Sequence, residues 1–449
     1  MDQFPARRVA VALLSAIWCC VGLAATSARA AEGKDAAPAR PTYRQVKAEL
    51  SRPRGGMPNV LAKLDAGQTV RVSYLGGSIT AQAGWRVKTM KWFQQTWPKA
   101  KVVEINAAIG GTGSSLGVFR VGQDVLAHRP DLLFVEFAVN DGGPAPESIW
   151  RAMEGIVRQT WRQDPNIDIC YVYTIHTAGM PADYVKGLCP RSTSSMELLA
   201  DHYAIPSIDV GLRVVQLHEE GKLIYKPAVE PAPGKPATAP AGKILFANDD
   251  CHPRDEGHDV YTEVITAAIR SMTGVGKAGP HELKAPFIAD NWEQAKIVPL
   301  APAMLSSGWE KLPTDKGFGK WFGRQMPTIW QATRPGEKIT FRFRGTKVGL
   351  YDLVGPDGGQ ALCPVDGKAH KPRPRFDMYC TYHRIATLEI ADGLDGSQVH
   401  TVEVAIGPDQ PDRSAVTNVE KTKPNFDPKK YDGTAMRVAG ILLIGEIAE

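Results

Sequence analysis

The sequence predicts an α/β domain with a parallel sheet in three layers, followed by an antiparallel β-sandwich. Two patterns carry this prediction. Between residues 70 and 272, continuous apolar runs alternate with helix-like stretches, which is typical of a parallel sheet buried on both faces. After Met272, short runs of alternating polar and apolar residues are separated by turns rich in Gly, Asp and Pro, which favours antiparallel strands in a sandwich.

Five apolar runs are expected to form the parallel sheet, and five helix-like stretches are expected to cover it. The strands are predicted at 70–76, 101–109, 131–139, 168–175 and 204–210. The helices are predicted at 84–97, 114–128, 147–163, 192–203 and 255–272. Because parallel strands end at one edge of a sheet, where ligands bind, residues that follow these strands are candidates for a functional site.

The C-terminal region reads as a separate β domain over residues 278–449, after an α/β domain over residues 70–277. Its strands are predicted at 338–344, 348–353, 384–390, 400–406 and 436–444. Trp321, Trp330 and Tyr351 could stack on sugar rings, although core packing is the commoner role for any one of them. Residues 227–242, rich in Pro, Ala and Gly, are expected to be a surface insertion rather than a lid or wall over a binding cleft.

Length and composition agree with two globular domains. The chain has 449 residues, too many for one ordinary core. Hydrophobic residues make up 43% and charged residues 22%, an ordinary globular balance. The formal net charge is +5 without a dense run of Lys and Arg, so nucleic acid is a poor candidate partner. No Cys-x-x-Cys pair or His-rich cluster indicates a metal, and we expect no cofactor.

The first 30 residues have the features of a signal peptide. Arg7 and Arg8 precede an apolar run over 9–25, and Ala28 and Ala30 are the small residues that a signal peptidase requires. The apolar run is short and no second one follows, so we expect a periplasmic or extracellular protein without a membrane span. Residues 31–69 are then a leader to the α/β domain.

Export to an oxidising compartment makes disulfides possible. Of the 7 cysteines, two lie in the signal segment. Cys363 and Cys380 could pair with each other, and a bridge from Cys189 to Cys251 could pin the loop around Cys251. Cys170 lies in a strand-like run and is expected to be buried and free.

Ser78 and the pair Asp249 and His252 point to chemistry. Ser78 follows two glycines at the end of the first strand, and Asp249 and His252 are three residues apart. Nucleophilic catalysis by serine needs a base to take its proton and a carboxylate to orient that base. This spacing lets Asp249, rather than Asp250, reach one ring nitrogen while the other faces Ser78. The pattern predicts a serine hydrolase, whereas His258, on the following helix, is expected to be solvated.

Two further strand ends offer donors for an oxyanion hole. The second strand runs into Gly111, where a glycine lets a backbone N–H approach a substrate closely. The third runs to Asn140, whose amide is a further donor. Together with the N–H of Ser78, these groups could stabilise the charge that develops on a substrate oxygen. The loss of one such donor costs about 3 kcal/mol.

The four segments, in this order, resemble the SGNH (GDSL-like) hydrolases over roughly residues 70–272. The residues that carry the resemblance are Ser78, Gly111, Asn140 and His252. The chain has Gly77 where the family often has Asp, and Ala138 where it usually has Gly. The resemblance implies a flavodoxin-like three-layer fold. Because the family includes lipases, thioesterases, arylesterases and carbohydrate acetylesterases, it does not by itself identify a substrate.

We expect an exported esterase that removes O-acetyl groups from a polysaccharide or oligosaccharide. The C-terminal domain is similar to the jelly-roll modules of some carbohydrate esterases, and it could bind glycan. Two alternatives stay open: a lipid, thioester or aryl esterase of the same family, and a glycan-binding protein with a vestigial site. Arg86 resembles a feature of polysaccharide-acting members and could face an acidic sugar or support packing. His176, at a strand end, could touch substrate.

Overall fold

The computed structural model describes residues 40–227 and 237–449. The predicted signal peptide and part of the predicted surface insertion therefore lie outside the described residues. Within the described ranges, no helix combines the length and the apolar character that a bilayer crossing requires.

The first domain is built on a sheet that contains six strands among the described residues, in the order β1-β6-β5-β4-β2-β3. The bounds are β1 Ser51–Arg52, β2 Thr69–Gly76, β3 Lys101–Asn106, β4 Leu132–Glu136, β5 Asp168–Tyr173 and β6 Ser207–Asp209. Strands β2 to β6 pair in parallel, and β1 joins β6 antiparallel. The order of the parallel strands is that of a flavodoxin-like sheet, which confirms the predicted fold class.

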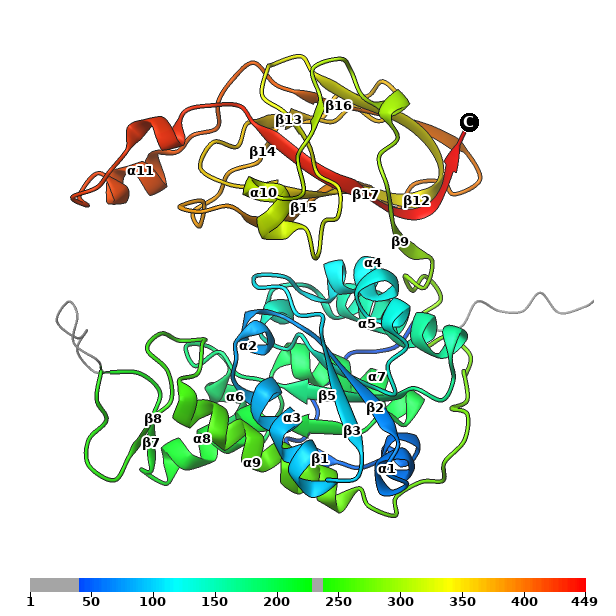
Figure 1. The fold of residues 1–449 in the computed structure, drawn as a ribbon, viewed down its shortest axis with the longest axis vertical. Coiled ribbons are helices and arrows are strands. Elements are labelled where there is room, and N and C mark those ends of the chain that lie inside the picture. The colour runs from blue at the N-terminus through cyan, green and yellow to red at the C-terminus, as the bar shows by residue number, and fades with distance from the viewer. Residues whose placement is uncertain (1–39, 228–236) are drawn as a thin grey trace, which may run out of the picture. The chain divides into compact units, whose positions relative to one another are not determined.

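Helices cover both faces of this sheet (Figure 1). Their bounds are α1 Pro58–Asp65, α2 Ser78–Ala81, α3 Trp85–Thr96, α4 Ser114–Asp124, α5 Pro146–Gln163, α6 Pro181–Val185, α7 Arg191–Tyr203, α8 Val210–Glu219 and α9 Asp255–Ser271. Successive strand residues point to opposite faces. Leu133 and Val135 of β4 pack with α4, α5 and α7. Leu132 and Phe134 pack with α1, α3, α8 and α9, which gives the three layers.

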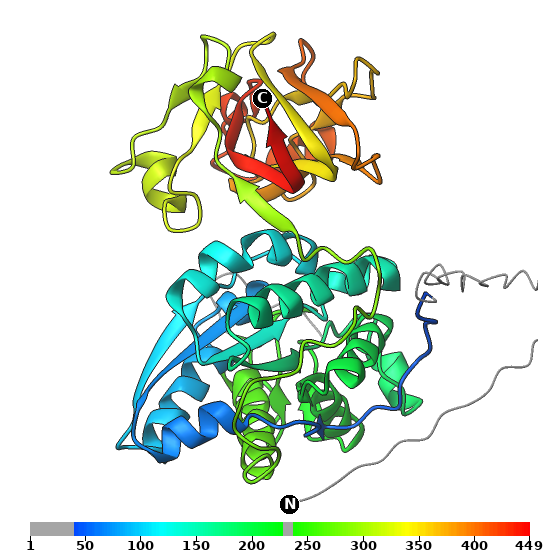
Figure 2. The ribbon, with the colours of Figure 1, turned by 90° about the vertical axis from the view of Figure 1, so that its right-hand side faces the viewer.

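The second domain is a sheet of nine antiparallel strands within the described part of the chain. The bounds are β9 Ala295–Val298, β10 Glu310–Lys311, β11 Trp330–Ala332, β12 Lys338–Val354, β13 Gln360–Leu362, β14 Arg373–Pro374, β15 Arg384–Asp392, β16 Val399–Ile406 and β17 Met436–Ala448. The two short helices beside it are α10 Gly317–Phe322 and α11 Ser414–Glu420. The predicted antiparallel β domain is confirmed, and the last strand, β17, is red in Figure 2.

Strand β12 pairs with different neighbours along its length. Its first half, 338–344, pairs with β16, and its second half, 347–354, pairs with β15, while β17 runs beside both halves. The sequence predicts two strands here, but the chain forms one strand with register shifts near Gly345 and Val348.

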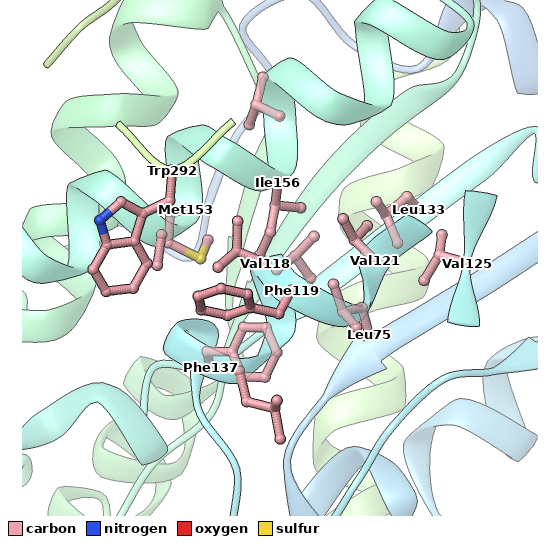
Figure 3. Close-up of a cluster of buried hydrophobic side chains, with 14 of the residues drawn as sticks. Leu75, Val118, Phe119, Val121, Val125, Leu133, Phe137, Met153, Ile156 and Trp292 are labelled. Atoms are coloured by element: carbon pink, nitrogen blue, oxygen red, sulfur yellow. The ribbon is translucent and has the colours of Figure 1, made fainter. Parts of the chain in front are cut away.

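One hydrophobic cluster contains residues of both domains. Phe119 of α4 packs against Trp292, with ring centroids 6.1 Å apart (Figure 3). The same cluster contains Tyr351 of β12 and Leu442 of β17. The Lys347 ammonium lies 4.7 Å from the centroid of the Trp292 ring, in cation–π contact. Residues 40–449 accordingly form one compact unit.

The predicted disulfides are absent, because all five cysteines of the described residues are free. Cys363 lies in the core of the C-terminal sheet, whereas Cys380 belongs to a separate small cluster. Cys189 Sγ lies 3.9 Å from Asp209 Oδ2 at the end of β6, and Cys251 lies in the loop before α9. Both predicted pairings are therefore wrong, whereas Cys170 is buried and free as predicted.

Candidate active site

Ser78 lies where β2 ends and α2 begins. Gly77 is extended, with φ −89° and ψ −154°, and Ser78 is the first residue of α2. A Cβ atom on Gly77 would lie 2.0 Å from Asn140 Oδ1. The glycine therefore lets the loop after β4 come close to the serine, which explains why this chain has no side chain at position 77.

His252 connects Ser78 with Asp249. The distance from His252 Nε2 to Ser78 Oγ is 2.8 Å, and that from Nδ1 to Asp249 Oδ2 is 2.9 Å. Asp249 Oδ1 accepts the backbone N–H groups of Cys251, at 2.8 Å, and His252, at 2.7 Å. These bonds close a tight turn that holds the carboxylate and the ring together. With the imidazole proton on Nδ1, Nε2 is free to accept the serine hydroxyl.

The electrostatics of this turn favour an ionised Asp249. Partial burial acts to raise the pKa of Asp249, but the hydrogen bonds from His252 and Cys251 outweigh it and hold the pKa below its usual value. The neighbouring carboxylates are engaged elsewhere. Asp250 Oδ2 lies 2.7 Å from Lys226 Nζ, and Asp255 pairs with Lys88 at 2.8 Å.

Gly111 and Asn140 lie close to Ser78. Gly111 has φ +73°, in the left-handed region that favours glycine, and it lines the same cavity as Ser78. Asn140 opens a short 3₁₀ helix, η2, over Asn140–Gly142. No hydrogen bond within the described ranges uses the Asn140 amide, so it remains available to a ligand. The sequence-predicted donors are thus gathered around the serine.

Asp141 joins the loops that carry Gly111 and Asn140, and sequence reasoning missed it. Its Oδ1 accepts the Ser114 N–H at 3.0 Å, and a Cβ atom on Gly113 would lie 2.3 Å from this oxygen. Burial raises the pKa of Asp141 to about 7 against the opposing hydrogen bonds from Ser114. Its position directly after Asn140 was the available signal in the sequence.

Arg86 and His176 do not line the cavity beside Ser78. Arg86 is buried, and its guanidinium donates to the carbonyl of Thr80 at 3.0 Å and pairs with Glu104. Of the two roles left open for Arg86, the structure supports packing. The His176 N–H contacts Met180 Sδ at 3.2 Å.

His258 is buried, so the expectation of a solvated ring is wrong. Its side chain packs against Gly84, where a Cβ atom would lie 2.2 Å from the ring. Nδ1 accepts the Trp85 N–H at 3.2 Å. Burial, helped by the charge of Lys88, lowers the pKa of His258 to about 4.

The cavity beside Ser78 and His252 has a volume of about 790 Å³, and the C-terminal domain forms one of its walls. Three aromatic side chains of that wall are strongly exposed: Trp321 at 69%, Tyr379 at 63% and Tyr382 at 59%. We refer to these three residues as the aromatic rim. Of Trp321, Trp330 and Tyr351, which the sequence suggested as sugar-stacking candidates, only Trp321 belongs to this rim. Tyr351 is buried in the cluster that contains Phe119, and Trp330 packs against the core of the C-terminal sheet.

Ser78 at the end of β2 is hydrogen-bonded to His252, and His252 to Asp249, in the loop before α9. This arrangement beside a parallel sheet defines the class of α/β serine hydrolases. Residues 74–260 match the model of the GDSL-like lipase/acylhydrolase family. The resemblance predicted from the sequence is thereby confirmed, and the chain is a carboxylic ester hydrolase. Within the described ranges, no group of three or more His, Cys, Asp or Glu side chains could hold a metal ion.

Two solved structures share the fold over both domains. A two-domain esterase (CEX) active on acetylated mannans, co-crystallised with mannopentaose, superposes with a TM-score of 0.68 at 20% identity, covering 91% of this chain and 100% of that chain. A second structure of a two-domain esterase (CEX) active on acetylated mannans gives a TM-score of 0.67 at 20% identity, covering 88% and 97%. No curated protein matches this chain.

Proposed function

We propose that this protein is an exported carbohydrate esterase that removes O-acetyl groups from a polysaccharide or oligosaccharide. The aromatic rim at the cavity of Ser78 carries the proposal. Exposed aromatic rings offer flat apolar faces to sugar rings, while their polar edges stay hydrated. An esterase for long acyl chains would instead need an enclosed apolar pocket. The similarity to a two-domain esterase active on acetylated mannans supports the same substrate class.

In the proposed mechanism, Ser78 Oγ attacks the acetyl carbonyl while His252 Nε2 takes the serine proton. Asp249 orients His252 and stabilises the imidazolium that forms. The N–H groups of Ser78 and Gly111 and the amide of Asn140 bind the oxyanion. His252 then donates its proton to the leaving sugar hydroxyl, which gives the acetyl-enzyme. Water, activated by His252, releases acetate and restores Ser78.

Acetate release from acetylated mannan, xylan and pectin, compared with an aryl acetate, tests the reaction and the substrate class. We expect release from at least one glycan and its loss in Ser78→Ala, with a nearly unchanged melting temperature, because Ser78 supplies chemistry rather than packing. Near-normal turnover by a folded Ser78→Ala variant would exclude the serine mechanism.

A matched pair of surface variants tests the aromatic rim. Trp321 and Met378 are both 69% exposed, but only Trp321 lines the cavity. We expect Trp321→Ala to raise KM for the acetylated glycan by roughly fivefold, because stacking on a ring contributes on the order of 1 kcal/mol. Met378→Ala should have no effect, and both variants should hydrolyse aryl acetate normally. Equal effects of the two variants on the glycan would argue against a sugar-stacking role.

Export rests on the N-terminal segment alone. The proposal predicts that protein recovered outside the cytoplasm begins at or close to Ala31, which N-terminal mass spectrometry measures. Recovery of the full-length chain only from the cytoplasm would refute export without touching the proposed chemistry.

A further inference from the structure

Helix α2 carries Ser78 at its first position and is only four residues long. So short a helix has little stability of its own, so its position depends on the groups that contact it. We propose that Glu136 and Arg86 are positioning residues that hold α2 at its two ends and thereby fix Ser78 Oγ relative to His252. This inference rests on the proposed role of Ser78 as nucleophile.

Glu136 accepts hydrogen bonds from the segment that contains Ser78. It is the last residue of β4, it is 1% exposed, and it forms no salt bridge within the described residues. Its Oε2 accepts the Thr80 hydroxyl at 2.8 Å, and its Oε1 accepts the Thr174 hydroxyl at 2.7 Å. The Gly77 backbone N–H is a third donor. A buried carboxyl group without a cation is costly unless hydrogen bonds compensate it, and two of these three come from the segment of Ser78.

The glycine before this segment makes the contact with Glu136 possible. A Cβ atom on Gly76 would lie 2.7 Å from Thr80 Oγ1 and 2.9 Å from the Glu136 carbonyl oxygen. Any side chain at this position would push Thr80 away from the carboxyl group. Burial raises the pKa of Glu136, and the hydrogen bonds from Thr174, Thr80 and Gly77 oppose this rise.

Arg86 holds the C-terminal end of α2. Its Nε donates to the Thr80 carbonyl at 3.0 Å, and its Nη2 lies 3.5 Å from the Ala81 carbonyl and 3.4 Å from that of Gln82. The last carbonyls of a helix have no partner within the helix, and a cation there also interacts favourably with the helix dipole. Glu104 of β3 pairs with the guanidinium and fixes it in place.

The two contacts explain why charged residues are buried beside the serine but outside the cavity. Neither Glu136 nor Arg86 lines the cavity, so neither is a catalytic residue. His252 approaches from the separate loop before α9, so the position of α2 sets the 2.8 Å distance between Nε2 and Ser78 Oγ. A displacement of about 1 Å at such a contact costs on the order of a hundredfold in rate.

The rate at which a fluorophosphonate labels Ser78 tests this inference without substrate binding. We expect Thr80→Val and Glu136→Gln to slow labelling and to lower kcat for aryl acetate by roughly tenfold to a hundredfold, with KM nearly unchanged. Thr80→Ser should restore the wild-type rate because it restores the hydroxyl group. Arg86→Gln should act in the same direction as Glu136→Gln.

Two buried charges away from Ser78 provide matched controls. Glu154 is fully buried and accepts the Tyr203 hydroxyl and the Phe287 and Ile288 N–H groups, and Arg158 is buried beside Glu293. Glu154→Gln and Arg158→Gln should lower the melting temperature but leave the labelling rate unchanged.

The outcomes separate this inference from the proposed function. Wild-type labelling rates in Thr80→Val and Glu136→Gln would overturn the positioning role, whatever their stability. If Glu136→Gln does not fold, the Thr80→Val and Thr80→Ser pair decides the question. Failure of the wild-type protein to be labelled at Ser78 would instead refute the proposed nucleophile, and the positioning role with it.

Discussion

Asp249 illustrates how a short turn can prepare a carboxylate for its partner. Its two oxygens receive the Nδ1–H of His252 and the backbone N–H groups of Cys251 and His252. These donors are present before any substrate binds, so the ring is already oriented toward Ser78. Preorganised polar groups of this kind do not have to rearrange during a reaction.

We expect Asp249→Asn to lower kcat for aryl acetate by at least a hundredfold, because an amide would favour the wrong tautomer of His252. Asp250→Asn is the matched control: this neighbour faces Lys226 and should lose little activity. Initial rates at saturating substrate measure both variants. A larger loss in Asp250→Asn would reverse the assignment of the acid.

Short motifs were enough to predict which residues meet around Ser78. Asp249 and His252 could be paired from their spacing alone, and Ser78 from the glycines before it. Glu136 could not be found, because its contacts with Thr80 and Thr174 depend on the pairing of strands far apart in the sequence. Arg86 was recognised as a candidate from the sequence. Only the direction of its side chain in the structure distinguishes contact with a sugar from contact with α2.

At the scale of elements, α9 supplies the N-terminal cap of α3. Gly84 precedes α3 and has no side chain to accept the first N–H groups of that helix. His258 of α9 accepts the Trp85 N–H instead, in the space that Gly84 leaves open. Nδ1 of His258 must carry no proton to accept this hydrogen bond, and burial favours the neutral imidazole ring.

This cap predicts a loss of stability in mild acid. The pKa of His258 is lowered from 6.5 to about 4 in the folded protein, so below 6.5 the unfolded chain binds a proton that the folded chain rejects. The contribution is complete above pH 6.5 and is lost as the pH falls toward 4. At about 1.4 kcal/mol per pKa unit, it amounts to at most about 3 kcal/mol.

Comparison with His258→Asn isolates this effect, because the asparagine oxygen can still accept an N–H but does not titrate. Asp141 and Asp209, each with a pKa raised by burial to about 7, act in the opposite direction as the pH falls, but they are common to both proteins. Urea unfolding between pH 7.5 and 4 should show the wild type losing more stability than the variant. Parallel curves would refute the prediction, and exposed His128→Asn serves as the control.

The element boundaries were predictable where periodicity decided them. The predicted helices 84–97 and 147–163 correspond to α3 and α5 within one residue at each end. Helix α8 was missed, because the apolar run over 204–210 continues into it without a break. Asp209 ends β6 and caps α8 by accepting the Leu212 N–H at 3.0 Å. The switch from strand to helix at this residue depends on tertiary contacts rather than on the local sequence.

At the scale of the whole molecule, the shared hydrophobic cluster bears on how independent the two domains are. Trp292 lies beyond the residues that match the family model, yet it packs beside Phe119 and Met153 of the α/β domain (Figure 3). The sequence shows a change of pattern after Met272, but it does not show which apolar residues of the two domains pack against each other. The boundary near residue 277 stays a prediction, and its consequence for folding can be measured.

We expect the full-length protein to unfold in a single calorimetric transition, because separating the domains would expose the cluster of Phe119, Trp292 and Leu442 to water. A fragment ending at residue 277 lacks Trp292 and Leu442 and should melt well below the intact protein.

Leu442 and its neighbour Leu443 form a matched pair of positions, because Leu442 belongs to the shared cluster whereas Leu443 packs in the core of the C-terminal sheet. Each Leu→Ala change should cost about 2–5 kcal/mol. Leu442→Ala should split the transition into two, whereas Leu443→Ala should only lower it. Two transitions in the wild type, one of them at the melting temperature of the fragment, would show instead that the α/β domain folds alone. Acetate release by the fragment, which lacks the aromatic rim, would then measure what the rim contributes.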